Sequence, residues 1–423
     1  MIRSIRGLTH SRFIRDVATL SSGKVFSAII RIALVPVIAR LYLPEHYGTA
    51  ALFVSIATVL VPIGILSFPQ AMVLPERDED SAGLAALAFT GLLCFAMLLW
   101  LLTAISRAMG YEILPHLGIW IWAIPVAIIL QGGLMIAENW LTRCRGFALS
   151  AVGDVTQSLT TSGMRVGVGL ALSSAVWPLI GSVILGFFAR LLVYGPALAR
   201  IGREVARQNA RTLWRLARNY RQFPLYNTPA ALLFSLNSQL PLLILGWLFS
   251  TQDVGRYAMV QGLLLMALTT IGESIRRVYL HRSTRNVKDK GVLRRDYVRA
   301  TTILAIIGLV PALLLILIGE PVFTWILGAR WAGTGAYAAA LVPWFYMQWL
   351  ALPAAALIIT LRRQGYWLMF QQTSLLGLCA GMVAGSMFSN TPLGLLWGGS
   401  LARALMFAIL VFSINRTLRD LKT

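Results

Sequence analysis

Five positively charged side chains lie inside long apolar stretches of the sequence: Lys24, Arg31, Arg165, Arg190 and Arg403. An unpaired cation at the centre of a bilayer costs roughly 2.5 to 3.5 kcal/mol on insertion scales, so such residues rarely face lipid. The same stretches hold three acids, Glu138, Asp154 and Glu273, which cannot neutralise all five cations. We therefore expect a cationic cavity that binds an anionic substrate through these five side chains. The alternatives are pairing with the acids or extension of some cations to the membrane surface.

Arginine suits a phosphate or diphosphate because its planar guanidinium donates two parallel hydrogen bonds. Lys24 and Arg31 are seven residues apart and so share one helical face, and Arg403 lies near the middle of its apolar stretch. Arg165 and Arg190 lie nearer the ends of theirs, where extension to the surface is easier. A diphosphate lipid headgroup is the ligand that this set favours.

A second set of polar residues could line the same cavity or couple transport to an ion. Asp154, Ser158, Thr161 and Arg165 follow at i, i+4, i+7 and i+11, a narrow helical stripe. Such a stripe must face protein or water, and hydrogen bonding between helices is the alternative to a cavity. Asp154 is a better candidate than Glu273 for a proton or sodium site, but Arg165 and the nearby basic groups favour a purely structural role for it. The full set of coupling or polar-cavity candidates is Asp154, Gln157, Ser158, Thr161, Gln239 and Glu273.

Composition identifies the class of protein. The chain has 423 residues, of which 57% are hydrophobic and 13% charged, which indicates a polytopic helical membrane protein. Its net charge of +21 does not indicate nucleic-acid binding, because the basic residues lie between apolar stretches. The three cysteines and four histidines show no ligand spacing, so we expect no metal, no cofactor and no catalytic residues.

A membrane-spanning helix needs about 20 apolar residues. The sequence predicts twelve, at residues 16–40, 48–74, 83–106, 116–137, 151–172, 176–198, 223–249, 254–275, 298–318, 335–361, 366–388 and 393–414. The loops on the side of the N-terminus hold 28 Lys and Arg residues and those on the other side hold four. Because cytoplasmic loops are enriched in Lys and Arg, this asymmetry places both termini in the cytoplasm.

An internal repeat divides the chain. Residues 41–51 and 248–258 share Leu, an aromatic residue, Gly and Ala in step, at an offset of 207 residues. The offset equals six helices, so the two halves have the same orientation in the membrane. We expect an all-α fold with two parallel six-helix repeats around a central cavity. The expected parts are a basic arm (1–15), an N-terminal lobe (16–198), a linker (199–222), a C-terminal lobe (223–415) and a tail (416–423).

The linker carries an arginine every three or four residues between Arg200 and Arg218. This spacing predicts a basic amphipathic helix that binds anionic membrane lipids at the cytoplasmic surface. A solvated basic loop is the alternative.

Two segments, residues 39–48 (ARLYLPEHYG) and 72–82 (MVLPERDEDSA), are similar to the turns of the polysaccharide transporter family. These proteins are the lipid-linked oligosaccharide flippases of the multidrug/oligosaccharidyl-lipid/polysaccharide exporter superfamily. The resemblance implies movement of an undecaprenyl-diphosphate-linked oligosaccharide across the bacterial inner membrane by alternating access, for O-antigen (lipopolysaccharide) or exopolysaccharide assembly. It also implies a partner in the polysaccharide assembly machinery and a cationic cavity, consistent in type and depth with Lys24, Arg31, Arg165 and Arg403.

Two other functions compete with the flippase. A cation-coupled multidrug exporter of the same superfamily would be expected to line its cavity with acids and aromatic residues. A membrane polymerase or ligase would be an enzyme and would need a sizeable outward loop, which the predicted topology lacks. We therefore expect a transporter rather than an enzyme.

Overall fold

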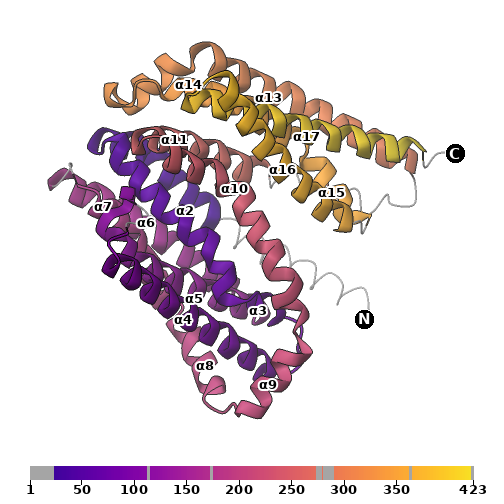
Figure 1. Ribbon diagram of the computed structural model, residues 1–423. Coiled ribbons are helices and arrows are strands. Elements are labelled where there is room, and N and C mark those ends of the chain that lie inside the picture. The colour runs from indigo at the N-terminus through magenta and orange to yellow at the C-terminus, as the bar shows by residue number, and fades with distance from the viewer. Residues whose placement is uncertain are drawn as a thin grey trace. The chain divides into compact units, whose positions relative to one another are not determined.

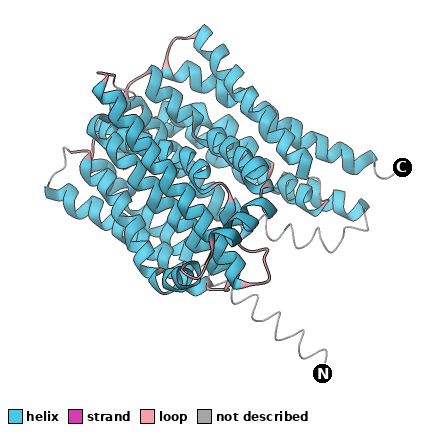
Figure 2. Cartoon of the chain, turned by 60° about the horizontal axis from the view of Figure 1, so that its bottom comes forward, coloured by secondary structure: helices cyan, strands magenta, loops and turns pink. Residues whose placement is uncertain are grey.

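The computed structural model describes residues 23–111, 115–171, 175–272, 279, 290–361 and 364–420. Throughout these ranges the chain forms helices joined by short turns, and no strand occurs among them (Figure 2). The all-helical class expected from composition is therefore confirmed. Glu273, one of the predicted coupling residues, lies outside the described residues.

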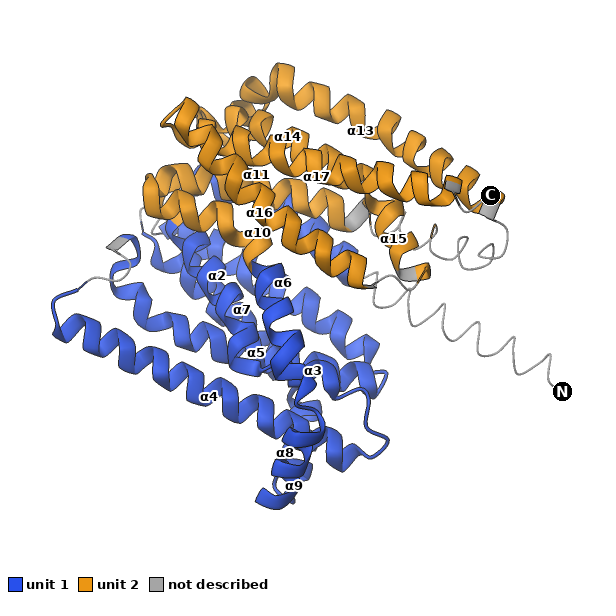
Figure 3. Ribbon diagram, turned by 45° about the vertical axis from the view of Figure 1, so that its right-hand side comes forward, with its two compact units in different colours: residues 1–42, 49–235 blue, residues 43–48, 236–423 orange. Residues whose placement is uncertain are grey.

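The chain divides into two compact units (Figure 3). Unit 1 comprises residues 1–42 and 49–235, and unit 2 comprises residues 43–48 and 236–423. The first turn of α2 is thus grouped with unit 2. The second boundary between the units, between Ser235 and Leu236, falls inside α10.

The helices of unit 1 follow the six apolar stretches of the first repeat (Figure 1). A first helix covers residues 23–41, before the labelled elements α2 (Pro44–Ile65), α3 (Phe68–Ala71), α4 (Asp78–Ala108), η1 (Pro115–Ala123), α5 (Ile124–Arg143), α6 (Phe147–Ala171), α7 (Trp177–Val193), α8 (Gly195–Val205), α9 (Ala210–Asn219) and η2 (Phe223–Asn227).

The helices of unit 2 follow the second repeat in the same way. They are α10 (Thr228–Leu248), α11 (Thr251–Ala267), η3 (Leu268–Gly272), α13 (Lys290–Leu327), η4 (Ala329–Trp331), α14 (Thr334–Leu350), α15 (Leu352–Thr360), α16 (Gln364–Phe388) and α17 (Pro392–Asp420). Within the described residues, each of the twelve predicted spans thus overlaps a helix or a pair of consecutive helices.

Seven helical segments of the described chain are long and apolar enough to cross a membrane alone, and up to nine if two bent pairs are included. Three helices fall outside this count for different reasons: the helix at residues 23–41, α6 and α11. The first of them carries three charged residues, Lys24, Arg31 and Arg40. α6 carries the polar stripe that begins at Asp154, which lowers its hydropathy. α11 has only 17 residues before the helix continues as the π-helical turn η3.

Two predicted single helices are in fact bent pairs. The helix predicted at 176–198 turns by 71° between α7 and α8. Gly195 and Pro196 begin α8, and Pro196 has no N–H to donate to the carbonyl of Leu192, so the helix breaks here. The helix predicted at 335–361 bends by 43° between α14 and α15, where Pro353 follows the break.

The predicted helix 48–74 ends earlier than expected. α2 stops at Ile65, and the next two residues, Leu66 and Ser67, have φ angles of 51° and 53°. These left-handed conformations interrupt the helix after α2, and the short helix α3 follows. The buried face of α3 joins a core of unit 1 that also includes residues of α4, α5, α8 and α9.

Candidate functional site

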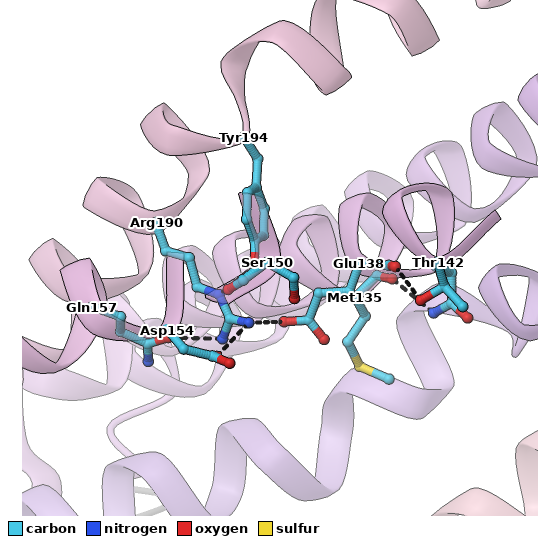
Figure 4. A network of polar contacts seen from close by, with 9 residues as sticks. Met135, Glu138, Thr142, Ser150, Asp154, Gln157, Arg190 and Tyr194 are labelled. Carbon is cyan, nitrogen blue, oxygen red and sulfur yellow. Dashed lines mark hydrogen bonds and ion pairs between the residues drawn. The ribbon is translucent and has the colours of Figure 1, made fainter. Parts of the chain in front are cut away.

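Arg190 lies at the centre of a polar network in unit 1 (Figure 4). Its Nη2 atom is 2.7 Å from Glu138 Oε1 on α5 and 2.7 Å from Asp154 Oδ1 on α6. Its Nη1 donates to Gln157 Oε1 at 3.0 Å and its Nε donates to the Tyr194 hydroxyl at 2.8 Å. One guanidinium on α7 therefore binds two carboxylates and an amide, and so ties α5, α6 and α7 together.

The network explains why a charged residue is tolerated at this position. The Arg190 side chain is 13% exposed and that of Asp154 is 14% exposed, so both are largely out of water. Burying a charge is costly unless it is paired and hydrogen-bonded, and Arg190 meets both conditions. One acceptor of the network is unsatisfied: Asp154 Oδ2 is buried and has no hydrogen-bond partner in the described structure.

Lys24 and Arg31 are exposed side chains on the helix at residues 23–41. Lys24 lies within range of electrostatic attraction to Glu138, and Arg31 within range of Asp154. Arg31 Nε donates to the Ser27 carbonyl of its own helix at 3.2 Å. The two acids of the network are therefore surrounded by three cations, and the two exposed cations remain accessible to a ligand.

The polar stripe of α6 makes contacts with α7. Arg165 Nε donates to Ser182 Oγ at 3.0 Å, and Thr161 Oγ1 donates to the Ser182 carbonyl at 3.3 Å. Ser158 is buried, at 6% exposure. The Cβ position of Gly186 on α7 is occupied by Thr161 Oγ1, so glycine is needed for this close approach. Thr161 and Arg165 of α6 thus both hydrogen-bond Ser182 of α7.

Arg403 on α17 is buried inside unit 2, at 6% exposure. Its Nη1 donates to the Asn237 carbonyl at 2.7 Å, and its guanidinium carbon lies 4.1 Å from the centre of the Trp344 ring. Nε is buried and has no hydrogen-bond partner among the described residues. No carboxylate of the described chain lies within ion-pair distance of Arg403, so this cation has polar and aromatic partners but no counter-charge.

The carbonyl that Arg403 binds is available because of a proline. Pro241 lies inside α10, four residues after Asn237, and has no N–H to donate to that carbonyl. The adjacent Ser238 carbonyl accepts from Gln261 Nε2 on α11 at 3.0 Å. Side chains from α17 and α11 thus satisfy carbonyls near the proline, as is required where a helix is broken within a membrane protein.

The structure distributes the predicted site residues between the two units. Lys24, Arg31, Arg165 and Arg190 belong to unit 1 and Arg403 belongs to unit 2, where Gln239 is half-buried. Sequence reasoning did not single out Tyr194 or Trp344, and it noted Asn237 only as a neighbour of the polar residues on its helix. The i, i+4 spacing of Arg190 with Tyr194, and of Asn237 with Pro241, was the signal that could have identified two of them.

Comparison with known proteins gives one family match. Residues 37–335 match the model of a family described as polysaccharide biosynthesis protein. No curated protein sequence matches the chain.

Solved structures with similar folds include a lipid flippase and multidrug transporters. The lipid II flippase MurJ in an inward closed conformation has a TM-score of 0.72 at 12% identity, covering 96% of this chain and 87% of that one. A multidrug resistance MATE family transporter of the MOP superfamily, facing inward, has a TM-score of 0.69 at 12% identity, covering 93% and 99%. The MATE multidrug transporter DinF-BH in complex with R6G has a TM-score of 0.57 at 15% identity, covering 95% and 92%. At these identities the likeness concerns the fold.

Proposed function

The chain belongs to the polysaccharide biosynthesis protein family, and from this premise we propose that it is a flippase for an undecaprenyl-diphosphate-linked oligosaccharide. It is a multi-pass membrane protein with a transporter fold. The proposed substrate crosses the bacterial inner membrane by alternating access and then enters O-antigen or exopolysaccharide assembly. The proposed protein partners are other components of that assembly machinery, and the protein itself performs no catalysis.

The observation that carries this proposal is the burial of Arg403 without a carboxylate. An uncompensated buried charge costs several kcal/mol, so a sequence that retains one gains from it elsewhere. A diphosphate would supply the missing counter-charge, and a guanidinium can donate two parallel hydrogen bonds to it. The unpartnered Nε of Arg403 is one donor available for that contact.

Lys24 and Arg31 are the proposed cations of unit 1 that contact the substrate, because both are exposed. Arg190 and Arg165 have supporting roles in this proposal. Each hydrogen-bonds a neighbouring helix, and Arg190 in addition forms ion pairs with both Glu138 and Asp154, although its single positive charge balances only one of them. With Lys24 and Arg31 this cluster holds three cations for two acids, and the excess positive charge suits an anionic headgroup.

The test measures export and abundance separately. Arg403→Ala should abolish surface glycan export while the protein still inserts and accumulates, because the change removes an insertion penalty of roughly 2.5 to 3.5 kcal/mol. Arg403→Lys should restore export only in part, because a point charge keeps the attraction but lacks the planar fork. Normal export by Arg403→Ala at normal abundance would refute the role proposed for Arg403.

A cation-coupled multidrug exporter is the second candidate function. Two observations favour it: the structural likeness to MATE transporters and the acid pair Glu138 and Asp154, of which Asp154 has an unpartnered oxygen. In this alternative Asp154 is the proton or sodium site. Proteoliposomes that accumulate R6G under a proton or sodium gradient, and lose this on Asp154→Asn, would support the exporter over the flippase.

The proposed topology has both termini in the cytoplasm. Reporters that are active only in the periplasm should be active when fused after Gly48 or Gly255, and silent after Asp80, Arg211 or Lys288. An active reporter after Arg211 would contradict the parallel arrangement of two six-helix repeats.

A further inference from the structure

The helix α9 is fixed onto one end of α4 within unit 1. Leu216 of α9 is 2% exposed and occupies the space where Gly83 of α4 would carry a Cβ atom. Arg215 pairs with Asp80 at 3.2 Å, and Gln208, just before α9, donates to the Glu79 carbonyl at 2.9 Å. α9 is therefore a docked element rather than a solvated loop.

The docking position sets the depth of α9 in the membrane. α4 has 31 residues, which corresponds to about 46 Å of helix and exceeds the hydrocarbon thickness of about 30 Å. Its first turn contains Asp78, Glu79 and Asp80, which belong outside the hydrocarbon. Because α9 contacts α4 between Asp80 and Gly83, it lies at the level of the lipid headgroups.

The outer face of α9 combines two arginines with an exposed tryptophan. Arg211, Trp214 and Arg218 are spaced by three and four residues and so share a face, which is turned away from the buried Leu216. Trp214 is 75% exposed. Within the described structure neither Arg211 nor Arg218 has a hydrogen bond, ion pair or ring contact, whereas Arg215 on the same helix is paired.

We propose that the stripe Arg211, Trp214 and Arg218 is a docking surface for the headgroups of anionic phospholipids. Guanidinium groups bind phosphate oxygens, and tryptophan is enriched where a membrane meets water because its ring is apolar and its N–H is polar. The net charge of +21 and the neighbouring exposed arginines, Arg203 and Arg207, add attraction to an anionic leaflet. If this face of α9 were only in contact with water, an exposed tryptophan between Arg211 and Arg218 would have no role.

The residues of this surface are separate from Lys24, Arg31 and Arg403, which are assigned to the substrate. Because α9 is held to α4 by Arg215 and Leu216, the lipid contact fixes this end of unit 1 at a defined depth. The lipid is identified by its chemistry, a phosphate-bearing anionic headgroup, and its source is the bilayer itself.

The test uses the full chain in nanodiscs that contain phosphatidylcholine with or without phosphatidylglycerol of the same acyl chains. The difference in fluorescence between the wild type and Trp214→Phe isolates the signal of Trp214. We expect this signal to be quenched by a lipid that carries a quencher at its headgroup, and to be protected from iodide in the water. A Trp214 signal quenched by iodide and not by the lipid would overturn the proposal.

A second measurement tests the arginines. Native mass spectrometry should find phosphatidylglycerol enriched over phosphatidylcholine on the wild type, and Arg211→Gln with Arg218→Gln should reduce this enrichment by at least roughly fivefold. The matched control is Arg77→Gln with Arg145→Gln, which removes two exposed cations elsewhere. Equal loss in the control would show that net charge alone attracts the lipid and would overturn the assignment to this stripe. Binding of a soluble anionic protein in place of lipid, at unchanged lipid enrichment, would overturn it as well.

Discussion

Gly48 and Gly255, which the sequence repeat relates by an offset of 207 residues, lie against each other in the structure. A Cβ on Gly48 would overlap the Thr251 carbonyl oxygen and lie 2.8 Å from the Gly255 nitrogen. A Cβ on Gly255 would overlap the Pro44 carbonyl oxygen and lie 3.1 Å from the Gly48 nitrogen. Pro44 and Thr251 are themselves related by the same offset, so the contact is reciprocal, like the contact across a two-fold axis. The two repeat motifs are thus each other's packing partners.

The glycine contact predicts a loss of stability on adding a single methyl group. Gly48→Ala or Gly255→Ala should destabilise the protein by about 1 to 3 kcal/mol, because the added carbon meets backbone that cannot move aside. Thermal unfolding in detergent measures this. Gly262→Ala is the matched control, because Gly262 lies on the same helix as Gly255 and its Cβ would have no neighbour within 4 Å. Tolerance of alanine at both contact positions would show that the helices can separate there.

The network around Arg190 predicts a large effect of unbalanced charge. Arg190→Ala leaves Glu138 and Asp154 without their cation, and removing one partner of a buried pair costs about 3 to 5 kcal/mol. Abundance and thermal stability should therefore fall together. Combining Arg190→Ala with Asp154→Asn should restore part of the loss, because the second change removes one uncompensated charge. If Arg190→Ala were stable but inactive, Arg190 would bind substrate directly.

Pro241 and Arg403 should be coupled energetically. Pro241→Ala gives α10 an N–H that can reach the Asn237 carbonyl, and this N–H then competes with Arg403. We expect the change in the free energy of unfolding caused by Arg403→Ala to differ by about 0.5 to 3 kcal/mol between the wild type and Pro241→Ala, as for residues that share a partner. A double-mutant cycle on thermal stability measures the coupling. Additive effects would mean that the freed carbonyl is not what holds Arg403 in place.

Much of the fold follows from hydropathy. Twelve apolar stretches predict twelve places for helices, because backbone groups in lipid must be satisfied within the segment itself. The breaks were less predictable. The 71° turn before Gly195 depends on Pro196, but Pro241 and Pro62 lie inside helices that continue past them. Whether a proline ends a helix depends on neighbouring donors, which a single sequence does not reveal.

The candidate site was predictable by residue type but not by partner. The sequence indicates that Arg190 and Asp154 both need polar surroundings, yet their contact depends on the relative rotation of α6 and α7. That rotation is set partly by small residues such as Gly186, which allows the close approach of Thr161. The stacking of Arg403 on Trp344 joins positions 59 residues apart and has no local sequence pattern.

The exposed cations of unit 1 give the sharpest test of substrate binding. Lys24→Ala and Arg31→Ala should each reduce glycan export with little change in abundance. Both side chains are exposed, and within the described structure neither forms an ion pair with Glu138 or Asp154, unlike Arg190. Surface glycan per molecule of protein in the membrane is the measurement.

If Lys24, Arg31 and Arg403 act on the substrate in the same step of transport, then combining Arg403→Ala with either of the other two changes should reduce export by less than the product of the single effects. The reason is that a ligand already lost through one contact cannot be lost again through another. Comparing Arg31→Gln with Arg31→Ala separates the effect of the lost charge from that of the lost side-chain volume, because glutamine keeps most of the volume of arginine. Independent, multiplicative effects would instead assign the cations of unit 1 and Arg403 to different steps of the transport cycle.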